Sequence, residues 1–156
     1  MNTKLLLSAI VLSAFLAGCG ESDDSTSVSA KAKSALCEKE AVRVMFGRSI
    51  VKTKVVCDSK EQATNMAQLE NMRGSDSFLD VYPSSQKIKF DMNGVSSKVD
   101  VALLDKDYKV VEVFTLTPES GVTTSDNKAV YVFKAPWGLL DGVKAGDSLE
   151  VKDLIL

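Results

Sequence analysis

The sequence predicts a mainly β domain in which an antiparallel sheet, barrel-like or half-closed, is accompanied by one helix. Segments of alternating or β-branched residues recur along the chain and are separated by residues that favour turns. Only one segment has apolar residues at helical spacing. Many short strands with turns between them are typical of antiparallel sheets that curl toward closure. The predicted strands cover residues 42–46, 50–56, 78–82, 87–92, 95–104, 108–116, 129–135 and 148–154.

The N-terminal segment has the composition of a secretory signal. Lys4 gives a positive start, an apolar run follows over residues 5–16, and the small residues Ala17 and Gly18 precede Cys19. This apolar run is too short to span a bilayer as a helix, which needs roughly twenty residues. It has the length of a signal-peptide core instead.

Residues 16–19 resemble the lipobox of bacterial lipoproteins. The resemblance implies diacylglycerol on the Cys19 sulfur, cleavage before Cys19 and an N-acyl chain on the new terminus, and we expect no other cofactor. Each buried methylene contributes roughly 0.8 kcal/mol, so several chains anchor the protein durably to a membrane. Gly20 stands where an aspartate would resemble the inner-membrane retention signal. We therefore expect an outer-membrane lipoprotein facing the periplasm in a Gram-negative cell, and an outward-facing one in a Gram-positive cell.

Composition divides the chain into three regions: a signal peptide over 1–18, a lipidated cysteine and flexible tether over 19–30, and one globular domain over 31–156. The tether is rich in Ser, Asp and Gly and lacks large apolar residues. Removing the signal removes one lysine and no acid, so the net charge changes from −2 to −3. No basic run is interleaved with aromatic residues, which argues against a nucleic-acid partner.

The chain contains no histidine. This absence removes the commonest general base, the Ser-His-Asp and Cys-His systems and most zinc sites, so we assign no catalytic residue. Asp105 and Asp107 lack the glycine and glutamate of a calcium loop and are expected to serve a turn, so we assign no metal site. Glu119 and Asp126 lie in a predicted polar loop over 117–128, with nothing to hold them as an acid–base pair.

Cys37 and Cys57 are expected to form a disulfide, because an exported pair is more often bridged than free. Residues 42–46 and 50–56 form a predicted hairpin about Gly47-Arg48, in which the numbers of opposite residues sum to 95. The numbers 37 and 57 sum to 94, within one residue of this register. A redox pair, the other interpretation, usually has Cys-x-x-Cys spacing. A structural bridge stabilises by about 2–4 kcal/mol.

The predicted helix follows the second cysteine. Ser59 and Gln62 have the spacing of a capping box, and Gly74 is the expected C-cap. Asn93-Gly94 is a strong turn signal and predicts a hairpin between the strands 87–92 and 95–104.

From about residue 49 to 156 the chain resembles a bacterial and archaeal family, domain of unknown function 192. The resemblance rests on segments 90–95 with 99–111, 129–133 and 142–147, which occur in the family's order and spacing. The family has no settled activity. Its polar residues in the first segment are replaced here, and its Glu after Tyr-Val-Leu is Lys134, so any family site with these residues is rebuilt or lost.

Two residues are candidates for a binding surface. Asp100, which the family retains, is expected to pair with a backbone amide or with Arg73, or else to line a pocket. Trp137, with Phe133 and Pro136 nearby, can form a platform for a sugar or a partner protein, or can be a half-buried core aromatic.

We therefore expect a membrane-anchored, non-catalytic binding or interaction module whose ligand is an envelope protein or an envelope glycan. The rival is a hydrolase or transferase that acts on envelope material and needs two carboxylates about 5–9 Å apart in one cleft. A purely structural spacer is the third hypothesis, and it predicts neither a pocket nor an exposed aromatic patch.

Overall fold

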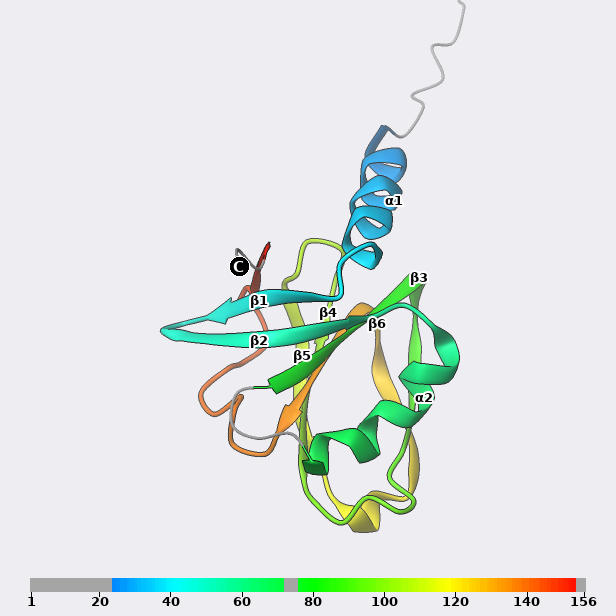
Figure 1. Cartoon of the computed structure of the whole chain (residues 1–156), viewed down its shortest axis with the longest axis vertical. Coiled ribbons are helices and arrows are strands. Elements are labelled where there is room, and N and C mark those ends of the chain that lie inside the picture. The colour runs from blue at the N-terminus through cyan, green and yellow to red at the C-terminus, as the bar shows by residue number, and fades with distance from the viewer. Residues whose placement is uncertain (1–23, 72–75, 154–156) are drawn as a thin grey trace, which may run out of the picture.

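The structure of the chain is a computed structural model that describes residues 24–71 and 76–153. Seven strands form one sheet in the order β5-β4-β6-β3-β2-β1-β7 (Figure 1). The predicted mainly β fold is confirmed. Every pair of neighbouring strands is antiparallel except β2 and β3, which are parallel. The strands are β1 (Ala41–Phe46), β2 (Ser49–Val56), β3 (Asp76–Asp91), β4 (Val99–Leu104), β5 (Val110–Leu116), β6 (Val122–Pro136) and β7 (Glu150–Asp153).

The hairpin of β1 and β2 has the predicted register. Val44 lies opposite Val51, and the numbers of opposite residues sum to 95 along the whole pair. Gly47 in the turn has a φ of +55°, a conformation that glycine adopts without a Cβ penalty. The predicted disulfide is present: Cys37 and Cys57 are bridged, with their Cα atoms 5.9 Å apart.

Helix α2 (Ser59–Gln68) and the short 3₁₀ turn η1 (Leu69–Asn71) connect β2 to β3. Parallel neighbouring strands need a long crossover connection, whereas a tight turn joins antiparallel strands. The helical connection therefore allows β2 and β3 to pair in parallel. The N-cap is Asp58, one residue before the predicted Ser59, and its carboxylate accepts hydrogen bonds from the backbone N–H groups of Lys60 and Glu61 at 3.0 Å. The expected C-cap, Gly74, lies outside the described residues.

A second α-helix, α1 (Asp24–Cys37), begins inside the predicted tether. This helix was not predicted because residues 20–30 are mostly polar and were interpreted as a tether. Alanines at 30, 32 and 35 nevertheless favour a helix. The C-terminal end of α1 is held against the domain. Leu36 is buried in the core, Cys37 is bridged to Cys57, and the Lys33 ammonium donates a 3.1 Å hydrogen bond to the Pro83 carbonyl.

The two longest strands, β3 and β6, pair along most of their length. The predicted strands 78–82 and 87–92 are one strand, β3, whose register shifts between Val81 and Gln86. The predicted loop 117–128 contains a 3₁₀ turn, η2 (Pro118–Ser120), and the start of β6. Asn93-Gly94 lies in a turn, but the predicted hairpin is wrong: β4 pairs with β5 and β6, not with β3.

Apolar side chains form two clusters. All six residues of β4 are buried. Ala102 and Leu104 belong to the cluster that also contains the core residues of β1, while Val101 and Leu103 belong to the cluster that contains Met66 of α2. Side chains that alternate between the two faces of a strand explain this division.

The sheet is mixed, not wholly antiparallel as predicted, and its strand order does not close into a barrel. An isolated bridge pairs Lys109 with Ser148, and the backbone N–H of Val110 donates a 2.8 Å hydrogen bond to the Asp147 carbonyl. These contacts join the segment before β7 to the start of β5 at one end only. Within the described ranges, none of the helices combines the length and apolar character that crossing a membrane requires.

Candidate functional site

The turn that follows β6 presents the most exposed large apolar side chain of the described ranges. Trp137 comes directly after Pro136, the last residue of β6, and its side chain is 64% exposed. Gly138 follows with a φ of +88°, which a residue with a Cβ rarely adopts. The sequence left open whether Trp137 is a platform or a core aromatic, and its exposure favours the platform.

Asp100 lies beneath this turn and fixes it. Its side chain is buried, and Oδ2 accepts hydrogen bonds from the backbone N–H groups of Gly138 at 2.7 Å and Leu140 at 3.2 Å. Oδ1 accepts a 2.8 Å bond from the Thr115 hydroxyl. Of the two partners considered from the sequence, the structure gives Asp100 the backbone amides, while Arg73 lies outside the described residues. Asp100 therefore positions the turn that carries Trp137.

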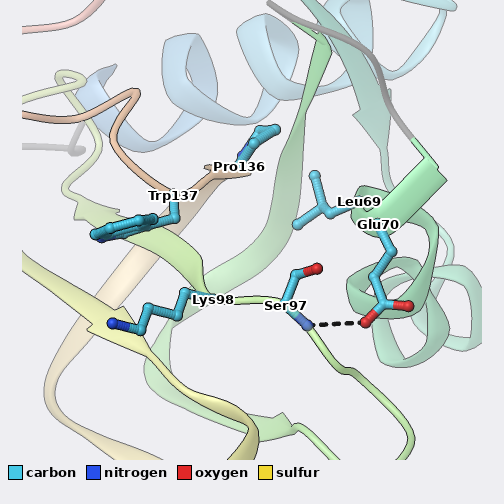
Figure 2. Close-up of a pocket in the computed structure, with 6 residues that line it drawn as sticks. All are labelled: Leu69, Glu70, Ser97, Lys98, Pro136 and Trp137. Carbon is cyan, nitrogen blue, oxygen red and sulfur yellow. Dashed lines mark hydrogen bonds between the residues drawn. The ribbon is translucent and has the colours of Figure 1, made fainter.

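A pocket of about 430 Å³ opens beside Trp137, and we call it the Trp137 pocket. In Figure 2 the indole and Lys98 lie on one side of it, and the side chains of the η1 turn lie on the other. The lining combines apolar surface with a cation, an anion and a hydroxyl. It consists of Leu69, Glu70, Ser97, Lys98, Pro136 and Trp137.

Glu70 is the anion of this pocket. It accepts hydrogen bonds from the backbone N–H groups of Ser96 and, at 2.9 Å, Ser97. Hydrogen bonds from the side chain and the backbone of Ser96 lower the pKa of the Glu70 carboxyl below its ordinary value. Glu70 is therefore a carboxylate at neutral pH, and it ties the η1 turn to the segment that enters β4.

Lys98 is the cation. Its ammonium lies 4.6 Å from the centroid of the Trp137 ring, within the range of a cation–π interaction. The contact restrains both side chains and places a positive charge beside the aromatic surface. Because Glu70 and Lys98 carry opposite charges, the ionised side chains lining the pocket sum to zero.

Sequence reasoning found Trp137 but not Glu70, Ser97 or Lys98. Together with Trp137 they come from three parts of the chain that only the fold brings together: the η1 turn, the entry to β4 and the exit from β6. Glu70 and Lys98 belong to no local motif, so nothing in the sequence marked them. The other predicted site residue, Cys19, lies outside the described residues.

A second cluster of polar side chains is buried between α2 and the sheet. The Lys134 ammonium lies 2.5 Å from Asp80 Oδ2 and donates hydrogen bonds to Asn65 Oδ1 at 2.5 Å and to the Gln62 carbonyl at 3.2 Å. The Asn65 amide donates a 2.7 Å bond to Asp80 Oδ1. Burial raises the pKa of Asp80 and lowers that of Lys134, and the attraction between the two charges opposes both shifts.

This cluster has the character of a structural ion pair. The Lys134 ammonium donates hydrogen bonds to two acceptors, Asn65 Oδ1 and the Gln62 carbonyl, and forms an ion pair with the Asp80 carboxylate. The cluster therefore fastens α2, and with it Glu70, to β3 and β6.

Of the remaining acidic candidates, Asp105 stabilises a turn, and Glu119 and Asp126 lie in different elements. Asp105 Oδ1 accepts bonds from the backbone N–H groups of Asp107 at 2.8 Å and Lys109 at 3.0 Å, as expected for a turn. Glu119 is in η2 and Asp126 is in β6. Within residues 24–71 and 76–153, no group of three or more cysteine or acidic side chains is arranged to hold a metal ion.

Two solved structures have a similar fold. A protein from Sinorhizobium meliloti 1021, provisionally described as a transcription regulator, superposes with a TM-score of 0.62 at 18% identity, over 72% of this chain and 92% of its own. A protein of unknown function from Novosphingobium aromaticivorans DSM 12444 gives 0.61 at 18% identity, over 70% of this chain and 83% of its own. At this identity the likeness concerns the fold alone.

The sequence comparison identifies the family. No curated protein has a matching sequence. The model of domain of unknown function 192, described as an uncharacterised ACR, matches residues 42–151, which span all seven strands except the first residue of β1 and the last two of β7. The chain therefore belongs to the domain of unknown function 192 family.

Proposed function

We propose that this protein is a lipid-anchored envelope protein whose family domain is a non-catalytic binding module, with the Trp137 pocket as its binding site. The observation that carries the proposal is the exposed Trp137 side chain, held at the edge of a pocket that also presents charged and polar groups. Exposed aromatic residues with fixed positions are typical of recognition sites, because they bury much surface at little entropic cost.

The ordered conformation of the turn that carries Trp137 supports a recognition role. A structural spacer would not require an indole held in water. Here the buried carboxylate of Asp100 accepts hydrogen bonds from the backbone of the turn that carries Trp137. The Lys98 ammonium lies over one face of the ring and restrains it. Preorganised side chains lose less freedom on binding, which favours affinity.

The anchor is proposed from residues 16–19, which resemble a lipobox. Lipidation of Cys19 would place the domain at the outer membrane facing the periplasm of a Gram-negative cell. Residues 20–23 and α1 would then separate the lipid from the sheet. A helix of 14 residues spans about 21 Å, so the domain would stand clear of the headgroups.

A carboxylate-dependent hydrolase or transferase is the alternative, and one observation favours it. A smaller pocket of about 200 Å³ is lined by two acidic residues, Glu112 and Asp126, beside Phe90 and Phe114. The Asn127 amide already donates a 3.1 Å hydrogen bond to Glu112. If this pocket cleaves envelope glycans, Glu112→Gln and Asp126→Asn will each abolish the release of reducing ends from isolated cell walls, whereas the binding module releases none.

Two experiments test the proposal. Metabolic labelling with radioactive palmitate should mark the wild-type chain and leave Cys19→Ser unlabelled, and membrane fractionation should then show the variant released from the membrane. Equal labelling of the two chains would refute the anchor.

The binding site is tested by photo-crosslinking in cells. A photoreactive amino acid at position 98 lies in the Trp137 pocket, while the same group at exposed position 106 lies beyond the opposite end of β4. A reproducible adduct from position 98 that position 106 does not give supports the proposal. Identical adducts from both positions, or none from position 98, would refute this pocket as the binding site.

A further inference from the structure

We infer that the Trp137 pocket binds an uncharged stretch of an envelope polysaccharide, with a pyranose ring stacked on the indole of Trp137. This inference rests on the proposed function and names its ligand. The apolar face of a pyranose ring is flat and carries C–H bonds, and the face of an indole attracts their partial positive charge. The Lys98 ammonium lies over one face of the indole, and Trp137 is 64% exposed, so a pyranose ring would stack on the other face.

The hydrogen-bonding groups of the pocket match hydroxyl groups. Glu70 is an acceptor only, Lys98 is a donor only, and Ser97 is both. A carboxylate has about four acceptor sites, so Glu70 keeps capacity beyond the backbone N–H groups of Ser96 and Ser97 and the Ser96 side chain. A sugar hydroxyl donates and accepts at once, and neighbouring hydroxyls of one ring can therefore satisfy all three side chains.

The charges of the pocket disfavour the other ligand classes. A phosphate or a polyanion would approach Lys98 but would meet the Glu70 carboxylate in the same pocket, and a polycation would meet the ammonium. Like charges so placed cost binding free energy. A neutral polyol gains hydrogen bonds from both groups and is repelled by neither.

The size of the pocket is compatible with this ligand. Its volume of about 430 Å³ lies in the range of small-molecule sites, roughly 300–1,000 Å³. The pocket is also open to solvent along its outer side, where Trp137 stands exposed, so a longer chain can pass through it.

The position of the pocket indicates which polysaccharide it meets. Figure 1 shows α1 rising from one end of the domain, while the C-terminal end of β6 and the η1 turn lie at the opposite end. The buried Leu36 and the disulfide fix this direction of α1. With Cys19 lipidated, the pocket faces away from the bilayer, toward cell-wall glycan strands and away from the sugars of the anchoring membrane.

The chain provides its own reporter, because Trp137 is its only tryptophan. We would titrate the full-length lipoprotein in detergent micelles with chitotetraose, a β-1,4-linked tetramer of N-acetylglucosamine, and separately with lipopolysaccharide core oligosaccharide. Chitotetraose should shift the emission to shorter wavelength and saturate. A response to the core oligosaccharide alone would overturn the assignment to cell-wall glycan. No response to either saccharide at millimolar concentration would overturn the carbohydrate inference.

Variants then test the assigned roles by calorimetry, which needs no fluorophore. Trp137→Ala should weaken chitotetraose binding at least about tenfold, and Trp137→Phe, which keeps an aromatic face, by less. Lys98→Gln should weaken it several-fold, whereas the matched surface change Lys106→Gln should have no effect. Equal affinity of Trp137→Ala and wild type would contradict stacking on the indole.

The binding-module proposal and the carbohydrate inference can be refuted separately. If position 98 crosslinks to one envelope protein in cells while neither saccharide moves the emission, the carbohydrate inference falls and the binding module stands. If position 98 captures nothing and neither saccharide binds, both fall.

Discussion

The carboxylate of Asp100 accepts a 2.7 Å hydrogen bond from the backbone N–H of Gly138. Asp100 is the second residue of the buried strand β4, and Gly138 directly follows the exposed Trp137. One buried charge thus orders the turn that carries the proposed binding surface.

Asp100→Ala should lower the free energy of unfolding by about 2–3 kcal/mol, because it leaves the N–H groups of Gly138 and Leu140 without their acceptor. Urea denaturation measures this change. Thr115→Val, which removes only the hydroxyl donor to Asp100, is the matched control and should cost about 1 kcal/mol. Trp137 should also become more mobile in Asp100→Ala, so its fluorescence anisotropy should fall. An unchanged urea midpoint and anisotropy would show that this carboxylate does not hold the turn.

Loss of the Cys37–Cys57 bridge should destabilise the domain by about 2–4 kcal/mol, because the bridge closes a loop across a sequence separation of 20 residues. The double variant Cys37→Ser with Cys57→Ser and chemical reduction of the wild type should give the same loss in urea denaturation. Hydrogen exchange in α1 should also rise. Stability that is insensitive to reduction would mean that Leu36 and Lys33 hold α1 without the bridge.

The buried pair of Asp80 and Lys134 should behave as a unit. Asp80→Asn or Lys134→Met alone leaves one charge buried without its partner and should cost about 3–5 kcal/mol. The double variant should be more stable than the sum of the two losses predicts, because it removes both charges. A double-mutant cycle in urea measures this coupling. Additive losses would contradict the ion pair.

The Glu70 carboxyl should titrate below its ordinary pKa of 4.5, since hydrogen bonds from Ser96 favour its charged form. A carboxyl whose pKa is lower in the folded state contributes stability above the unfolded value, and that contribution disappears as the pH falls through the folded value. The amide resonances of Ser96 and Ser97 should therefore report a midpoint below 4.5, absent from Glu70→Gln. A midpoint at or above 4.5 would show that these hydrogen bonds do not form in solution.

Local patterns predicted the parts of the fold that depend on neighbours in the chain. The β1–β2 register follows from alternating residues about Gly47, and the disulfide follows from that register. The partner of β4 could not be predicted in this way. Asn93-Gly94 favours a hairpin locally, but β4 is buried on both faces and gains more by lying between β5 and β6.

The candidate site was predictable only in part for the same reason. Trp137 was a candidate because of its residue type and its place after Pro136 in the sequence. Its partners Glu70 and Lys98 reach the pocket through the crossover of α2 and the order of the strands, which involve contacts distant in sequence. The buried pairing of Asp80 with Lys134 was also invisible, because residues 54 positions apart carry no shared pattern.

The disulfide also decides how the domain bears a pulling force. Tension applied at the N-terminus runs along α1 to Cys37 and crosses the sulfur atoms to Cys57, so residues 38–56 lie in a covalent loop that carries none of it. The force continues into Asp58 and α2, and the hairpin of β1 and β2 cannot be peeled strand by strand from this end. The bridge therefore shields β1 and β2 from a force applied through α1, because the covalent path passes from Cys37 directly to Cys57.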